Sequence, residues 1–308
     1  MNDIEPIDRT LALIKHLVPQ AYARAQGILG NVRDALTTSI WPDMAFRFSS
    51  LTNTGYPIEF AWSSRSRDLR FTFEAAPAEI PDHQRLPQAL ATLAALGVHG
   101  FHATDELQRA QRDTKLKFGA WIGARCSEKD VAYKLYIELP SALVSSSWVQ
   151  SVLDRSAITI PRPHMLWRMA GLSTTGGIEL YARSTNLEAL TLRSLVHQLD
   201  GNSATFLELV EGCVRQRELP ATSGISFAFD TTGAFAGLTL FVIAKHLYSS
   251  DGHVRNALLA LAKPNGYDTA LYEALSGGTE DGFWRHGMIG VGFQRGVGTW
   301  IQTGLRPV

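Results

Sequence analysis

The sequence has few features of disulfide-bonded, nucleic-acid-binding or membrane-spanning proteins. Its 308 residues include two cysteines, Cys126 and Cys213, which are too few for a disulfide framework. Lysine and arginine together number 29, as do aspartate and glutamate, so no net charge attracts nucleic acid or an anionic membrane. The longest apolar runs, such as 238–244, are too short to cross a bilayer, and the N-terminal segment is acidic and polar. We therefore expect a soluble, cytoplasmic protein with neither nucleic acid nor membrane as a partner.

Several catalytic and cofactor-binding motifs are also missing. The chain contains no GxSxG, HExxH or DDxxD motif, and GVGFQRG at 290–296 has one residue too many for a dinucleotide-binding loop. His99 and His102 have no third ligand nearby in the sequence, so we expect no metal site. Without an Asp-rich motif, a bound diphosphate would depend on protein cations. We expect that no cofactor is required; magnesium is possible but not implied by the sequence.

The sequence does contain a strand pair that recurs five times, each time as an antiparallel hairpin. Strict alternation, as in RFTFE, and turn residues between the paired runs mark these strands. The hairpins are expected at 56–62 with 69–75, 118–126 with 132–139, 164–173 with 177–183, 224–232 with 236–244, and 288–295 with 298–306. Helical patterns occupy the intervals, at 7–38 with a break at Pro19, and at 81–96, 104–117, 141–155, 187–199, 204–217, 252–263 and 267–275.

Five hairpins make ten strands, and a sheet of this size tends to close because closure removes its unpaired edges. A barrel of ten strands also encloses more space than its backbone fills. No Gly/Ser/Pro-rich linker divides the chain. We therefore predict an α+β fold in which residues 1–308 form one domain, a ten-stranded antiparallel β-barrel with helices outside and a central pocket.

The alternation also predicts which side chains face the lumen. If helices cover the outside, the apolar residue of each alternating pair faces them and the polar residue points inward. Buried cations cost desolvation free energy unless an anion pairs with them, and a phosphorylated ligand would supply that anion. In the second strands, the predicted lumen set is Arg70, Thr72, Glu74, Lys134, Tyr136, Glu138, Glu179, Tyr181, Arg183, Thr239, Phe241, Trp300, Gln302 and, last, Arg306.

These strands resemble those of a known family, the ABBA-type aromatic prenyltransferases, whose five repeated αββα units form a ten-stranded barrel. YPIEF with LRFTFEA is similar to the first hairpin of the dimethylallyltryptophan synthase branch, and YKLYIELP is similar to its K-x-Y strand. GIELYAR is closer to the corresponding strand of the cyanobactin peptide prenyltransferases. The resemblance implies an enzyme that moves a dimethylallyl or longer prenyl group from its diphosphate to an indole, a phenol or a peptide side chain. Its donor would be dimethylallyl or geranyl diphosphate.

The resemblance also implies roles for individual residues. Glu59 would hold the N–H or O–H of the nucleophile and draw off its proton as charge develops. Arg70, Lys134 and Tyr136 would contact the diphosphate, where cations stabilise the leaving group. Tyr181 would also contact the diphosphate and would shield the allylic cation.

Some positions depart from the family's pattern. Glu179 stands where a lysine would precede Tyr181 by two residues, and we expect Arg183 to substitute for that lysine as a diphosphate contact. A phenylalanine replaces the usual tyrosine in the fourth repeat, and the last strand, WIQTGLRP, has no tyrosine. Aromatic faces stabilise an allylic cation. The prenyl and acceptor pocket is expected to include Trp121, Phe241, Trp300 and Gln302.

Simpler interpretations remain open for each assignment. A lone glutamate such as Glu59 is usually solvated, Arg70 and Lys134 could lie on a wet outer face, and tyrosines are common in strands. Glu74 and Glu138 could simply neutralise the cations. The whole barrel could instead bind or carry a hydrophobic or isoprenoid ligand without catalysis. Buried charge favours the enzyme, because a carrier of an apolar ligand gains nothing from it.

Overall fold

The computed structural model describes residues 5–37, 44, 46–101, 104–112, 114–140, 143–156, 158–160, 165–215, 218–277 and 284–308. Thr38, Ser141, His164 and Arg217, which bound predicted elements, lie outside the described residues, as does His102. Among the described residues, no helix is long and apolar enough to cross a lipid bilayer.

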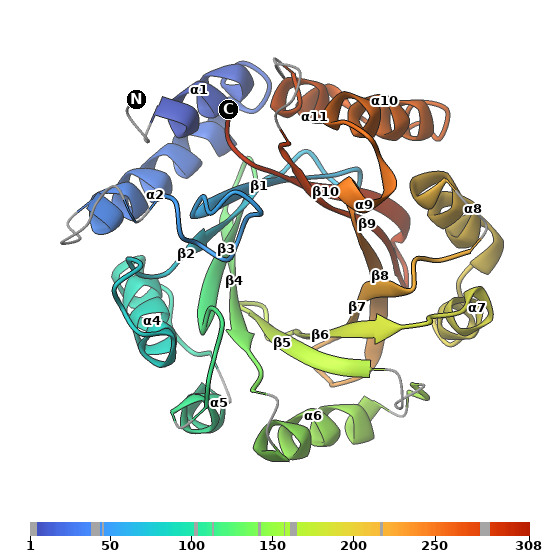
Figure 1. The fold of residues 1–308 in the computed structure, drawn as a ribbon, viewed down its shortest axis with the longest axis horizontal. Coiled ribbons are helices and arrows are strands. Elements are labelled where there is room, and N and C mark those ends of the chain that lie inside the picture. The colour runs from blue at the N-terminus through green and yellow to red at the C-terminus, as the bar shows by residue number, and fades with distance from the viewer. Residues whose placement is uncertain are drawn as a thin grey trace.

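The strands close into a barrel, as the recurring hairpins predict. Each strand pairs antiparallel with the next one in the chain, and β1 pairs with β10 to complete the ring (Figure 1). Closure leaves no strand edge unpaired. In the described part of the chain the ten strands are β1 Ile58–Ser63, β2 Leu69–Glu74, β3 Ala120–Cys126, β4 Val131–Glu138, β5 Met165–Ser173, β6 Ile178–Thr185, β7 Thr222–Phe229, β8 Phe235–Ile243, β9 His286–Gln294 and β10 Gly298–Leu305.

The helices surround the barrel on its outer side, as Figure 1 shows. They connect one hairpin to the next, so every hairpin turn lies at one end of the barrel and every helical connection at the other. We call these the hairpin end and the helix end. The helices are α1 Glu5–Ile14, α2 Pro19–Thr37, the 3₁₀ turn η1 Asp82–Gln84, α4 Arg85–Ala95, α5 Thr104–Gln111, α6 Leu143–Ser156, α7 Ala189–His197, α8 Ser203–Val214, α9 Ala244–Leu247, α10 Asp251–Ala262 and α11 Ala270–Leu275.

Helices α5, α7 and α8 each end at least two residues earlier than their sequence patterns predict, and the structure shows what ends or fixes two of them. Helix α8 stops at Val214 because Arg215 takes a left-handed conformation with φ of 55°, which breaks the α-helical backbone. Helix α5 stops at Gln111, whose buried side-chain amide donates to the carbonyl oxygens of Gly119 and Glu138 at 2.8 Å each. The end of α5 therefore ties together β4 and the chain entering β3.

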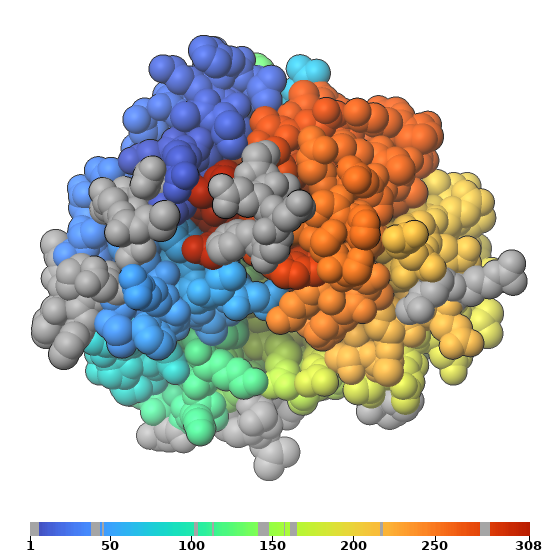
Figure 2. Space-filling view, turned by 45° about the horizontal axis from the view of Figure 1, so that its top comes forward, coloured from blue at the N-terminus to red at the C-terminus, as the bar shows by residue number. Residues whose placement is uncertain are grey.

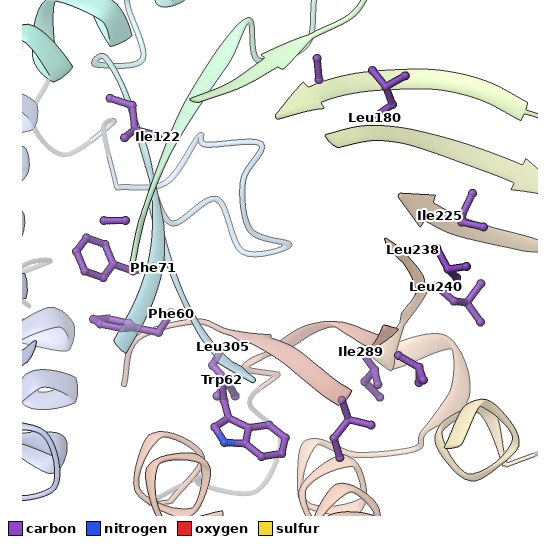
Figure 3. Packing of buried hydrophobic residues seen from close by; sticks show 14 of the residues in the cluster. Phe60, Trp62, Phe71, Ile122, Leu180, Ile225, Leu238, Leu240, Ile289 and Leu305 are labelled. Atoms are coloured by element: carbon purple, nitrogen blue, oxygen red, sulfur yellow. The ribbon is translucent and has the colours of Figure 1, made fainter. Parts of the chain in front are cut away.

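The hydrophobic core lies between the barrel and the helices. Phe60, Phe71, Leu135 and Leu180 are each at most 1% exposed. Figure 3 shows Phe60, Phe71 and Leu180 pointing away from the barrel interior toward the surrounding helices. Burial alternates along the strands, with every second residue of β4 buried from Tyr133 onward. The outward placement of the apolar set, expected from alternation, is confirmed.

The two ends of the chain meet on the outside of the barrel. Helix α1 packs against α11, and the space-filling view shows the N-terminal helices beside the C-terminal ones (Figure 2). The backbone N–H of Val308 donates to Thr10 Oγ1 at 2.8 Å. These contacts join the first and last repeats on the helical side, as the β1–β10 pairing does within the sheet.

Candidate active site in the barrel lumen

Register places the predicted polar residues on one face of the sheet. Glu59 pairs with Thr72, Thr72 with Gly123, and Gly123 with Lys134, which gives one row across four strands. A second row runs from Trp121 through Tyr136, Gly171 and Glu179. Because the apolar neighbours of these residues pack outward, both rows line the lumen.

Lys134 is held by an internal carboxylate. Its ammonium forms an ion pair with Glu179 and donates to the Tyr181 hydroxyl at 3.1 Å. It lies 5.4 Å from the ring centroids of both Tyr136 and Tyr181. Burial alone would raise the pKa of Glu179. The charge and hydrogen bond of Lys134, with other hydrogen bonds, outweigh burial, so the pKa of Glu179 lies below its ordinary value. The positive charge of Lys134 is therefore already balanced inside the barrel.

Tyr181 is a neutral phenol in this group. Burial, with Glu179 next, raises the pKa of its hydroxyl well above the ordinary value. Its ring meets Tyr136 edge-on at 5.9 Å and lies 6.2 Å from the ring of Phe241. The three predicted aromatic residues thus form one continuous aromatic wall.

Arg70 belongs to a different group, at the hairpin end. Its register partner on β3 is Arg125, and Arg65 comes from the turn between β1 and β2. Arg70 Nη2 donates to Ser66 Oγ at 3.2 Å, whereas its buried Nε has no hydrogen-bond partner. Burial, then Arg125, lowers the pKa of Arg70 to about 10, so the guanidinium stays charged at neutral pH. We refer to Arg65, Arg70 and Arg125 as the arginine cluster.

Glu59 lies near the helix end in a cradle of glycines. A Cβ on Gly287 would come within 2.5 Å of Glu59 Oε1, and one on Gly304 would overlap the carboxylate. Burial raises the pKa of Glu59 to about 7. No hydrogen bond or ion pair joins it to another described residue, and it lines a small cavity with Thr52 and Trp284. A carboxyl group of this kind can both accept and release a proton near neutral pH.

The remaining predicted residues occupy separate parts of the lumen. Trp121 stacks on Phe118 at 3.8 Å and donates its indole N–H to Glu74 at 3.1 Å. Trp300 donates to the side-chain oxygen of Gln302 at 3.1 Å. Arg183 is exposed, two positions along β6 from Tyr181 and nearer the helix end, and no ion pair links it to another described residue. The structure thus does not bring Arg183 to the arginine cluster.

The two glutamates that could have neutralised the lumen cations bind elsewhere. Glu74 pairs with Arg85 of α4 at 2.7 Å and accepts from Ser49 at 2.5 Å. Glu138 accepts backbone N–H groups of Lys117, Phe118 and Gly119 at 2.8–3.0 Å. Their contacts anchor the chain that leads into β3, so neither serves as counter-ion to Arg70 or Lys134.

Glycines on the lumen face make room for the large side chains of the site, a role that alternation of polar and apolar residues does not predict. A Cβ on Gly123 would come within 2.9 Å of the Tyr136 ring, and one on Gly290 within 2.8 Å of Gln302 Cγ. Small residues therefore leave room for large polar side chains to lie against the opposite strand. In the sequence, Gly290 and Gly292 at alternate positions of β9 indicate this packing.

Replacing Gly292 with alanine is expected to destabilise the barrel by about 1–3 kcal/mol, the usual cost of overpacking. A Cβ at this position would overlap the Trp300 indole. Denaturant unfolding of the two proteins measures the difference. The matched control is Gly27→Ala in α2, where no atom lies within 4 Å of the added methyl group and stability should not fall. Equal effects at both positions would contradict tight packing of the lumen wall.

Comparisons with known proteins agree with this architecture. No family model matches the sequence, and no curated protein matches it. Among solved structures, 5-dimethylallyltryptophan synthase from Streptomyces coelicolor is 17% identical, with 96% of this chain and 94% of that chain covered and a TM-score of 0.75. The prenyltransferase PriB is 15% identical, with 99% and 96% covered and a TM-score of 0.79. The 6-dimethylallyltryptophan synthase from Micromonospora olivasterospora is 15% identical, with 99% of this chain and 97% of that chain covered and a TM-score of 0.78.

These likenesses establish the fold class. The chain folds as the ten-stranded barrel of the ABBA prenyltransferases, over nearly its whole length. The fold implied by the sequence resemblance is confirmed.

Proposed function

We propose that this protein transfers a prenyl group from an allylic diphosphate to an electron-rich aromatic acceptor, an indole, a phenol or a peptide side chain. The observation that carries the proposal is the content of the lumen: buried cations, a wall of aromatic rings and a carboxyl group of pKa about 7 in one barrel. The Streptomyces coelicolor synthase, which has the same fold, was solved with DMASPP and tryptophan bound. We place the reaction in the cytoplasm.

The proposed reaction begins when the C–O bond of the donor breaks and its electron pair leaves on the diphosphate. Arg70 stabilises that charge through charge-assisted hydrogen bonds, for which its unpartnered Nε is available. The allylic cation lies against the faces of Tyr136, Tyr181 and Phe241. Their closely packed rings also keep water from the cation.

Glu59 completes the proposed reaction at the acceptor. Its carboxylate orients the N–H or O–H group of the acceptor, whose ring carbon or heteroatom attacks the cation. As the new bond forms, the acceptor loses a proton to Glu59. Because burial places the pKa of Glu59 at about 7, the group is ionised enough to accept the proton at neutral pH.

We further propose that the reaction requires no metal ion, with side-chain cations stabilising the diphosphate. Chelation with EDTA is then expected to leave the initial rate of prenyl transfer within about twofold of the untreated rate. Removal of a catalytic metal would instead cost several kcal/mol of transition-state stabilisation and lower the rate far more. The measurement is product formation with and without EDTA, and with magnesium added back. A rate abolished by EDTA and restored by magnesium would contradict this proposal.

A thermal-shift titration tests the donor class. Dimethylallyl, geranyl and farnesyl diphosphate are each compared with the matching prenyl alcohol. We expect stabilisation by the diphosphates and little by the alcohols, because only the former engage the lumen cations. Equal stabilisation by an alcohol and its diphosphate would favour a barrel that binds isoprenoids without using its charges.

A further inference from the structure

The arginine cluster and the Lys134 group differ in how their charges are balanced. Lys134 has the carboxylate of Glu179 as an ion-pair partner and the Tyr181 hydroxyl as a hydrogen-bond acceptor. The cluster has three guanidinium groups and two neighbouring carboxylates. Asp68 lies 3.7 Å from Arg125 Nε, and Glu179 acts on Arg65 but is itself ion-paired with Lys134. Asp68 also accepts a hydrogen bond from Ser66 at 2.9 Å. The positive charge of the lumen is therefore concentrated at the hairpin end.

Like charges in the cluster lie close together without full compensation. Arg70 and Arg125 are register partners on neighbouring strands, an arrangement that is destabilising for like charges. The guanidinium of Arg65 lies 5.2 Å from the centroid of the Trp300 ring, which holds it over the mouth of the barrel. The buried Nε–H of Arg70 has no acceptor, and leaving such a donor unpaired also costs free energy. An anion in this position would relieve both costs.

We propose that Arg65, Arg70 and Arg125 form the site for the diphosphate of the donor, and that Glu179 competes with that diphosphate for the lumen cations. This inference rests on the proposed function and adds to it Arg65 and Arg125 as binding residues and Glu179 as an internal competitor. A diphosphate has enough acceptor oxygens to bind three guanidinium groups, whose planar N–H donors match phosphoryl oxygens in pairs.

The direction of the donor follows from the register. Arg70 lies on β2 two residues nearer the hairpin end than Thr72, which is the register partner of Glu59. A diphosphate bound at the cluster therefore sits toward the hairpin end, and its prenyl chain runs inward past the aromatic wall toward the level of Glu59. The diphosphate site and Glu59 thus lie at different levels of the lumen, two residues apart along the β1–β2 pair.

Titration calorimetry with inorganic pyrophosphate tests the site separately from the chemistry. We expect Arg65→Gln and Arg125→Gln each to weaken binding about tenfold, which matches the loss of one charge-assisted hydrogen bond. Both side chains are exposed, and removing either one relieves like-charge repulsion in the cluster, so the variants should not unfold at a lower midpoint than the wild type. The matched control is Arg67→Gln in the same turn, whose side chain is 80% exposed and pairs with Asp268. It removes the same charge and should leave binding within about twofold.

Replacing Glu179 should change the affinity for pyrophosphate in the opposite direction from replacing an arginine. Glu179→Gln removes a lumen carboxylate near Arg65 and releases Lys134, so pyrophosphate should bind severalfold more tightly. Tighter binding cannot arise from damage to the fold. Unchanged affinity in Arg65→Gln and Arg125→Gln, an equal loss in Arg67→Gln, or weaker binding by Glu179→Gln would overturn the proposal.

The same proteins separate this inference from the proposed function. Pyrophosphate binding that depends on the cluster, in a protein that transfers no prenyl group to any acceptor, would leave the anion site in place and remove the function. Prenyl transfer by a protein whose Arg65→Gln and Arg125→Gln variants bind pyrophosphate normally would retain the function and remove this site.

Discussion

Glu59→Gln is expected to lower prenyl transfer at least a hundredfold, the usual effect of losing a general base. Glutamine keeps the shape and the hydrogen-bonding capacity of the side chain between Gly287 and Gly304, but it cannot take the proton of the acceptor. Donor binding should be unchanged. Ionisation of the donor should persist, because Glu59 is assigned to the acceptor. It is followed as the prenyl alcohol that forms when water captures the allylic cation.

The pH dependence of the same variant is informative. Since the pKa of Glu59 is about 7, wild-type transfer should rise as pH increases through 7 and then level off, because only the ionised carboxylate accepts a proton. Glu59→Gln should lack that rise. The control is Glu128→Gln, an exposed position outside the lumen, which should keep both the rate and the profile. Normal transfer by Glu59→Gln across several acceptors would remove this residue from the mechanism.

Arg70→Gln is expected to weaken the binding of allylic diphosphates by about 1.5–3 kcal/mol, or roughly 10- to 100-fold, as a hydrogen bond from a charged donor is lost. Arg70 should have the largest effect in the arginine cluster because its guanidinium is the most buried of the three. Lys134→Gln should cost less, since Glu179 already balances that charge.

A matched ligand separates this effect from damage to the fold. The uncharged prenyl alcohol offers the same carbon chain without phosphoryl oxygens, so its affinity should change little in Arg70→Gln. Titration of both ligands against wild type and variant is the measurement. Equal losses for the alcohol and the diphosphate would mean that Arg70 supports the fold through Ser66 rather than binding an anion.

Most of the barrel could be predicted because its strands obey a local rule. In LRFTFE, the residues that pack under helices must be apolar and their neighbours need not be, so alternation alone assigns Phe71 and Phe73 to the outside and Arg70 to the lumen. The same rule places Lys134 and Tyr136 on the lumen face. Recurrence of the hairpins then supplies ring closure, because every strand pairs with its neighbour in the chain.

Contacts across the lumen were harder to predict, since they depend on several strands at once. Lys134 and Glu179 lie on β4 and β6, and they meet because Gly171, on the strand between them, has no side chain to separate them. Arg65 lies in a turn, where no alternation indicates its direction. Arg125 could have been found, since it follows Trp121 and Gly123 at alternate positions of β3.

The most direct test of the central claim is an assay for prenyl transfer itself. The protein is incubated with dimethylallyl diphosphate and, separately, with tryptophan, a phenol and a tyrosine- or tryptophan-containing peptide, and the products are identified by mass spectrometry. We predict that at least one acceptor gains one dimethylallyl group, with release of diphosphate that depends on Arg70 and transfer that depends on Glu59. Binding of the donor with neither diphosphate release nor a prenylated product, across all acceptors and with geranyl diphosphate as an alternative donor, would contradict it.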